Sequence, residues 1–167
     1  MVDLTSYKTR ILSAEDEPLF EDAVKAAGSG ALRAAYVMIW LSCAESLKRK
    51  FREAQIRDGI AARIVGDLAR KEAEHKSIDK FLLDKAREYG FLSYSAYTIL
   101  LHVYEMRCIY GHPYEEAPGE EQVFNAAAAT IDYVLSQPVK LRHGFGSQLL
   151  DNLLKDAILH ANAKIYS

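Results

Sequence analysis

An arginine and a histidine that could act on one anion lie close together in the stretch 93–114. Arg107 is followed by four residues and then by His112, which a glycine precedes and a proline follows. Glycine is common just past a helix end, and a residue before proline is disfavoured in the helical conformation. We therefore expect a helix that ends near Tyr110, with Arg107 in its last turn and His112 just beyond it.

A guanidinium and an imidazole beside one phosphate could cleave RNA without a metal ion. The ribose 2′-hydroxyl attacks its own phosphate, and Arg107 would offer a planar fork of donors to the developing negative charge. His112, with a reference pKa of ~6.5, would exchange a proton with the attacking or leaving oxygen near neutral pH. The same spacing also fits an arginine that favours a helix C-terminus, followed by a surface-loop histidine.

Hydrophobic periodicity predicts an all-α protein. Half of the 167 residues are hydrophobic and 26% are charged, as in ordinary globular domains, and the length suits one domain with a real core. We expect residues 1–167 to form a single domain, a compact bundle of five to six helices. The main helical patterns extend over 31–57, 60–75, 78–89, 93–110 and 119–136. A lead-in at 1–13 and a short helix at 16–27 precede them, and a last helix at 148–165 follows.

The helix at 31–57 is expected at the centre, since residues 34–44 are almost all apolar. Trp40 would be its largest anchor. Glu45 follows directly on the apolar run and has two interpretations. It either pairs at the rim with Arg49 four residues later, or it faces the arginine–histidine pair.

The charge pattern gives little sign of a nucleic-acid surface. Net charge is −2, so no overall basic field is expected. The basic run at 48–52 is interpreted mainly as a solvated helix end and only secondarily as a phosphate track. Cys43 and Cys108 are the only cysteines, and both lie in apolar runs. They are interpreted as buried thiols of a reducing compartment.

Nothing in the chain indicates a cofactor, a metal site or a membrane segment. No cysteine–histidine spacing fits a metal site, and no glycine-rich phosphate loop is present. The first ten residues lack the apolar core of a signal peptide, and the longest apolar run is too short to span a bilayer. We therefore expect a cytoplasmic protein without membrane contact.

The spacing of Arg107 and His112 resembles the signature of the HEPN superfamily, small helical domains of which many are ribonucleases. The helix order is similar as well, and the run 40–47 (WLSCAESL) resembles the family's second helix, which often carries a glutamate, here Glu45. The resemblance covers roughly residues 30–136. Members of the family often have Asn, Asp or His directly after the arginine, whereas Cys108 stands there in this chain.

The resemblance implies a metal-independent endoribonuclease, a toxin or antiviral defence effector whose partners are RNA and an antitoxin. It also implies a homodimer that brings two motifs into one cleft. The sequence His112-Pro113-Tyr114 resembles the ending of one toxin branch, in which a partner nucleotidyltransferase modifies the matching tyrosine. Tyr114 would be that residue, or else an ordinary loop tyrosine. Tyr110 could stack on a base, or serve only in packing.

Two other interpretations of the whole chain stay open. One is a non-catalytic HEPN-like dimer that acts as a binding or scaffold module. The Cys108 departure and the acidic net charge favour this alternative. The other is an all-helical protein in which the spacing of Arg107 and His112 is accidental.

Overall fold

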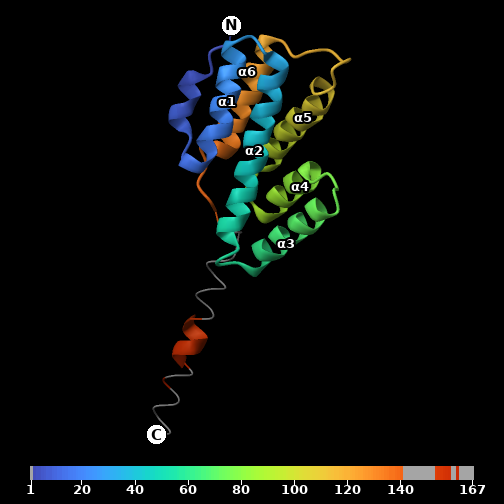
Figure 1. The fold of residues 1–167 in the computed structure, drawn as a ribbon. Helices are drawn as coiled ribbons and strands as arrows, with labels where there is room; N and C mark the ends of the chain where they lie inside the picture. Colours follow the sequence, from blue (N-terminus) through green and yellow to red (C-terminus); the bar gives the residue numbers. More distant parts are fainter. Residues whose placement is uncertain (1, 141–152, 159–160, 162–167) are drawn as a thin grey trace.

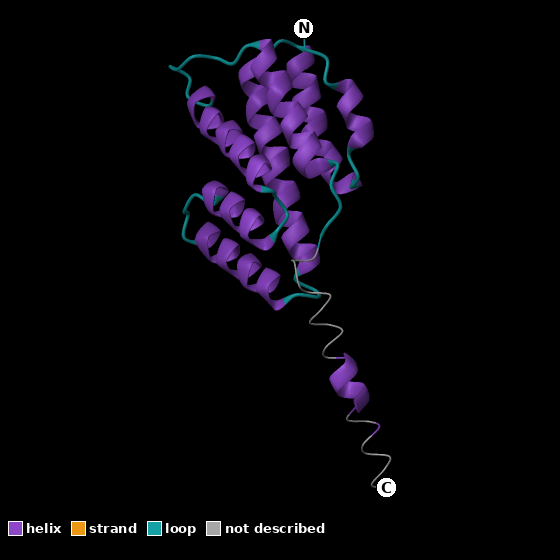
Figure 2. Ribbon diagram, turned by 180° about the vertical axis from the view of Figure 1, so that it is seen from behind, coloured by secondary structure: helices purple, strands orange, loops and turns teal. Residues whose placement is uncertain are grey.

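The computed structural model describes residues 2–140, 153–158 and 161 (Figure 1). In this part of the chain all of the regular secondary structure is helical; loops join the helices, and there is no strand (Figure 2). Its α-helices are α1 Glu17–Gly28, α2 Leu32–Ala54, α3 Gly59–Ala73, α4 Asp79–Tyr89, α5 Tyr94–Tyr110 and α6 Glu120–Thr130. Three short segments accompany them, the 3₁₀ helices Thr5–Arg10 and Ala14–Asp16 and the π-helix Ile131–Leu135. The all-α prediction is confirmed, and the helix count within these residues is slightly above five to six.

Helix α2 lies at the centre of the bundle and contacts each of the other five α-helices (Figure 1). Trp40, Leu47 and Phe51 on α2 are completely or almost completely buried. The Trp40 ring lies 5.2 Å from the ring of Tyr104 on α5, so it joins the centre of the bundle to the helix that carries Arg107. The predicted position of this helix is therefore confirmed. None of the helices in the described part of the chain is long and apolar enough to cross a bilayer.

The N-terminal lead-in belongs to the core, which the sequence did not suggest. Leu4 is fully buried. Arg10 forms a 2.6 Å ion pair with Asp132, and the backbone N–H of Leu12 donates to the carbonyl of Leu135 at 3.0 Å. The segment 1–13 was expected to be an arm or a short extended lead-in, but its residues 5–10 form a 3₁₀ helix that packs on α6 through the rings of Tyr7 and Phe124.

Two members of the basic run at 48–52 are buried, so the expectation of a solvated helix end was wrong for them. Arg49 is 8% exposed and donates to both carboxylate oxygens of Asp16 at 2.9 Å, while Ser46 donates to Asp16 at 2.7 Å. Lys50 is 2% exposed and donates to the carbonyl of Gln137. Burial, and next the charge of Arg49, lowers the pKa of Lys50 to about 8. Each buried cation thus holds a distant segment against α2.

Helix α5 begins and ends where local signals predict. The hydroxyl of Ser93 accepts from the backbone N–H of Ala96 at 3.2 Å, which caps the first turn. The Tyr97 hydroxyl donates to Asp84 on α4 at 2.5 Å and ties the two helices together. The buried stripe of α5 consists of Ala96, Leu100, Val103 and Tyr110. The helix ends at Tyr110, as predicted.

The last predicted helix, 148–165, lies largely outside the described residues. Of this range, residues 153–158 and 161 are described and are helical. Helix α6 covers the first part of the pattern predicted at 119–136, and the π-helix covers most of the rest. The pattern at 119–136 is therefore helical over most of its length.

Replacing Trp40 with alanine is expected to lower the free energy of unfolding by about 3–5 kcal/mol, because it opens a cavity between α2 and α5. Denaturant unfolding followed by circular dichroism measures this change. Ile56→Ala is the matched control: this side chain is 83% exposed, so its loss should change stability by less than about 0.5 kcal/mol. Equal unfolding midpoints for the two variants would contradict the central position of Trp40.

Candidate functional site

Arg107 projects from the last turn of α5 towards the start of α4. Its Nη1 atom lies 4.0 Å from Oδ2 of Asp79, which is in the first turn of α4. Both side chains are partly buried. At this separation the two charges attract without a short hydrogen bond, since a direct N–H···O contact is nearer 2.9 Å. The guanidinium therefore has one loosely held internal anion and stays partly open to solvent.

His112 lies in the exposed loop that follows α5. The backbone N–H of Gly111 donates to the carbonyl of Arg107 at 2.9 Å, and that of His112 donates to Ile109 at 3.0 Å. A hydrogen-bonded turn therefore follows the helix end and contains Gly111 and His112. These bonds fix the backbone of His112 relative to the turn that carries Arg107.

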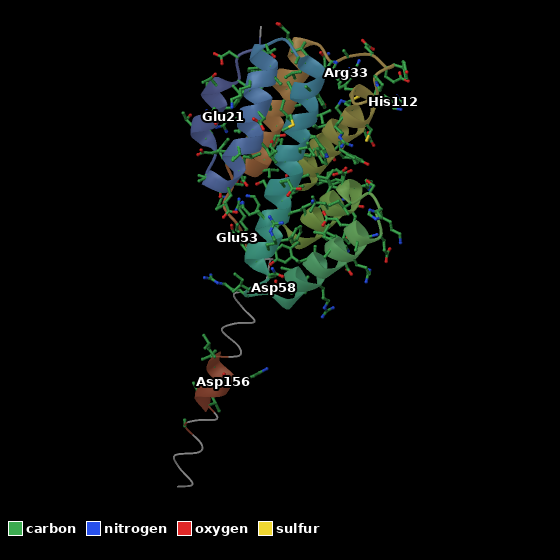
Figure 3. All side chains as sticks on the ribbon, viewed as in Figure 1. Glu21, Arg33, Glu53, Asp58, His112 and Asp156 are labelled. Atoms are coloured by element: carbon green, nitrogen blue, oxygen red, sulfur yellow. The ribbon has the colours of Figure 1, made fainter. Side chains whose placement is uncertain are left out.

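Arg33, at the start of α2, holds this loop with three hydrogen bonds. Its Nη1 donates to the carbonyl of Tyr110 at 2.5 Å and to that of His112 at 2.6 Å, and its Nη2 donates to that of Glu115 at 2.8 Å. Figure 3 shows Arg33 and His112 at the same end of the molecule, opposite Asp58. One side chain of the central helix thus determines the path of the loop from residue 110 to residue 115.

Arg33 was missed by the sequence analysis, although one signal was present. Its partners are backbone carbonyls 77 to 82 residues away, which leave no trace in a side-chain pattern. However, a cation in the first turn of a helix opposes the helix dipole, so it needs a partner elsewhere. The first turn of α2 contains no acidic residue that could supply one.

The tyrosines near the motif have different environments. Tyr110 is 7% exposed, and its ring meets that of Tyr36 edge-on at 4.9 Å, which is a packing role. Tyr104 packs on Trp40, and its pKa is raised by burial and then by its hydrogen bond with Cys108. Tyr114 is 93% exposed, so its side chain is open to solvent.

Glu45 forms its ion pair within another cluster. Its Oε1 accepts from Lys48 at 2.8 Å, and Lys48 also donates to Glu72 on α3 at 2.7 Å. The pairing of Glu45 with Arg49 expected from their spacing was wrong, because Arg49 binds Asp16 instead. Within the described residues, none of the hydrogen bonds or ion pairs of Glu45 involves the arginine or the histidine of the motif.

Cys108, directly after the arginine, is exposed, whereas Cys43 is fully buried. The expectation of two buried thiols was therefore wrong for Cys108. The buried stripe of α5 is centred on Leu100 and Val103, and position 108 lies outside it. Burial raises the pKa of Cys43 to about 12, so this thiol stays protonated at neutral pH.

The charges around the motif are mixed. Asp79 faces Arg107, and the exposed residues Glu105, Glu115 and Glu116 lie next to it in the sequence or in the following loop. In the part of the chain that the structure describes, no group of three or more His, Cys, Asp or Glu residues is arranged to hold a metal ion. Arg107 and His112 therefore stand among carboxylate side chains rather than in a basic patch.

Replacing Arg33 with methionine is expected to loosen the loop. Backbone exchange at His112 and Glu115 should accelerate about tenfold or more, since bonds to a charged donor contribute roughly 1.5–3 kcal/mol. Hydrogen exchange followed by mass spectrometry or NMR measures this. In Arg33→Lys the amides of the loop should be only partly protected from exchange, because one ammonium group cannot reproduce the planar fork of donors of a guanidinium. Arg52→Met, at an exposed arginine of the same helix, is the control; equal exchange in both methionine variants would refute the clamp.

Comparison of the chain with protein-family models, with curated proteins and with solved structures finds no match. The resemblance to HEPN domains therefore rests on the Arg107–His112 motif and the order of the helices. What the protein does has to be inferred from the chemistry of these residues and from the surroundings described above.

Proposed function

We propose that this chain is a HEPN-type endoribonuclease that cleaves RNA without a metal ion, as a toxin or defence effector. The observation that carries the proposal is the clamp from Arg33, which fixes the loop of His112 to the end of the helix that carries Arg107. Catalysis with only two side chains requires them to be held at a defined separation.

The proposed reaction is an internal transesterification. The 2′-oxygen forms a bond to phosphorus as the bond from phosphorus to the 5′-oxygen breaks, which leaves a 2′,3′-cyclic phosphate and a free 5′-hydroxyl. Arg107 binds the non-bridging oxygens, where negative charge increases in the transition state. His112 takes the proton from the 2′-hydroxyl or gives one to the leaving oxygen. The phosphate displaces Asp79 from its loose contact with the guanidinium.

A homodimer would complete this sparse site. One imidazole cannot act as base and acid in the same step, whereas two copies of His112 across a two-fold axis supply both. Such an interface is isologous, with the same surface on each protomer. A nucleotidyltransferase partner could inhibit cleavage by modifying Tyr114. A nucleotide on this exposed hydroxyl would place bulk and negative charge two residues from His112.

The charges at the motif favour one alternative function, a non-catalytic dimeric binding or scaffold module. Asp79 already partly neutralises Arg107, and Glu115 and Glu116 follow His112 in the loop. A carboxylate in this position would hold the guanidinium as a structural group and repel an RNA backbone. In that case the clamp from Arg33 would present a protein-binding loop.

Purified protein is expected to cleave single-stranded RNA in the presence of EDTA and to leave DNA, which lacks the 2′-hydroxyl, intact. Arg107→Ala and His112→Ala should each lower the rate by about 10²-fold or more, and Arg107→Lys should recover little. Asp79→Asn should tighten RNA binding, because it removes the competing anion. Gel analysis and mass spectrometry of the 5′ fragment, with its 2′,3′-cyclic end, measure the outcome.

The control is His75→Asn, which changes an exposed histidine outside the motif. Full activity in His112→Ala, or loss of activity in EDTA, would refute the mechanism. Absence of cleavage in any RNA pool would leave the scaffold function as the better account.

A dimer at micromolar concentration is expected from light scattering if two motifs share one cleft. The specific rate of RNA cleavage should fall on dilution in step with the dimer fraction, because each cleft needs a histidine from both protomers. A strictly monomeric protein with undiminished activity per chain would contradict the shared cleft.

A further inference from the structure

A cavity of about 370 Å³ lies between α5 and α6, beside the first turns of α2. Its size is within the ~300–1,000 Å³ typical of small-molecule sites. The aromatic rings of Tyr36 and Tyr110 line it together with aliphatic side chains of both helices. Four polar side chains, those of Thr98, His102, Gln122 and Asn125, complete the lining. Neither the proposed chemistry nor the packing of the bundle uses this cavity.

The two tyrosines add hydroxyl groups to the polar groups of the residues that line the cavity. Tyr36 is 3% and Tyr110 is 7% exposed, and neither hydroxyl is among the fully buried polar atoms that lack a hydrogen-bond partner. Burial, and next the neighbouring Tyr110, holds the pKa of Tyr36 far above its ordinary value, so its hydroxyl remains a donor at neutral pH. A ligand with acceptor atoms could therefore accept a hydrogen bond from this hydroxyl.

The chemistry of the lining selects the kind of ligand. No Asp, Glu, Lys or Arg lines the cavity, and His102 contributes an imidazole to the lining. A phosphate or a carboxylate would find no counter-charge there. Two amides, a hydroxyl and an imidazole supply donors and acceptors, and two aromatic rings supply apolar surface. This combination fits an uncharged flat ring with polar edges, which describes a nucleobase.

Tyr110 connects the cavity to the proposed catalytic loop. Its ring lines the cavity, while its carbonyl accepts from the guanidinium of Arg33 that also binds the carbonyl of His112. Tyr36 lies one turn after Arg33 on α2, so the central helix holds Tyr110 by both its ring and its backbone. A base in the cavity would therefore have its sugar and phosphate close to the loop.

We propose that this cavity binds the base of an RNA nucleotide next to the cleaved phosphate and so selects where the RNA is cut. The inference rests on the proposed ribonuclease function for its link to cleavage. The binding of a base can be measured separately, because a nucleoside has no phosphate to cleave.

The test is an NMR titration of the isotopically labelled chain with adenosine, guanosine, cytidine and uridine. At least one of them should cause saturable shifts at Thr98, His102, Gln122 and Asn125. Gln122→Ala and Asn125→Ala should each weaken that binding by roughly tenfold, the loss of one or two hydrogen bonds. Both side chains are exposed, so the fold should tolerate the changes. Gln55→Ala changes an amide side chain outside the cavity, and this variant should bind nucleosides like the wild type.

A short RNA that contains the preferred base should bind the cavity more tightly than the free nucleoside, and cleavage in Asn125→Ala should lose its base preference. Saturable nucleoside binding without any RNA cleavage would support base binding in the cavity and refute the proposed ribonuclease function. Cleavage without nucleoside binding at the cavity would keep the function and overturn the base site. Shifts that follow protein concentration rather than nucleoside would also overturn it, since the cavity would then be an interface between copies.

Discussion

Burial of most of α2 is the constraint on which the rest of the structure depends. This helix contacts every other α-helix, so its charged residues cannot all reach water. The buried Arg49 and Lys50 instead bind the carboxylate of Asp16 and the carbonyl of Gln137. The partly buried Arg33 binds the carbonyls of the 110–115 loop. An unpaired buried charge is far more costly than a hydrogen bond is favourable. Each cation therefore obliges a segment distant in sequence to take one position.

These contacts matter more for geometry than for total stability. Replacing a buried ion pair with well-packed apolar residues is often neutral or stabilising, so Arg49 and Asp16 need not add much free energy to the fold. Their effect is to allow one arrangement of chain segments and exclude others. The same reasoning applies to Arg33, whose three carbonyl partners define one path for the loop of His112. The candidate site is thus a consequence of how the core accommodates its charges.

The sequence predicts helices well because their signals are local. Apolar periodicity, the Ser93 cap and the helix-ending glycine and proline after Tyr110 all act within a few residues. Whether a side chain is buried depends on distant parts of the chain, which explains why some predictions of burial and exposure were wrong. The exposure of Cys108 and the burial of Lys50 depend on which elements pack against each position. Likewise the spacing of the motif is visible in the sequence, whereas the contact of Arg107 with Asp79 appears only in three dimensions.

The acidic surroundings of the motif change how RNA would have to bind. Proteins that bind nucleic acid through its backbone gain most of their affinity from phosphate contacts. Such contacts require several cations that are not already paired. Here Asp79 already accompanies Arg107, and two glutamates follow in the loop. Backbone attraction at this end must then be weak, and discrimination would come from contacts to bases. A cavity with amides and tyrosines but without fixed charge supplies contacts of that kind. A site of this composition would leave most RNA uncleaved and would cut only RNA in which an unpaired base can enter the cavity.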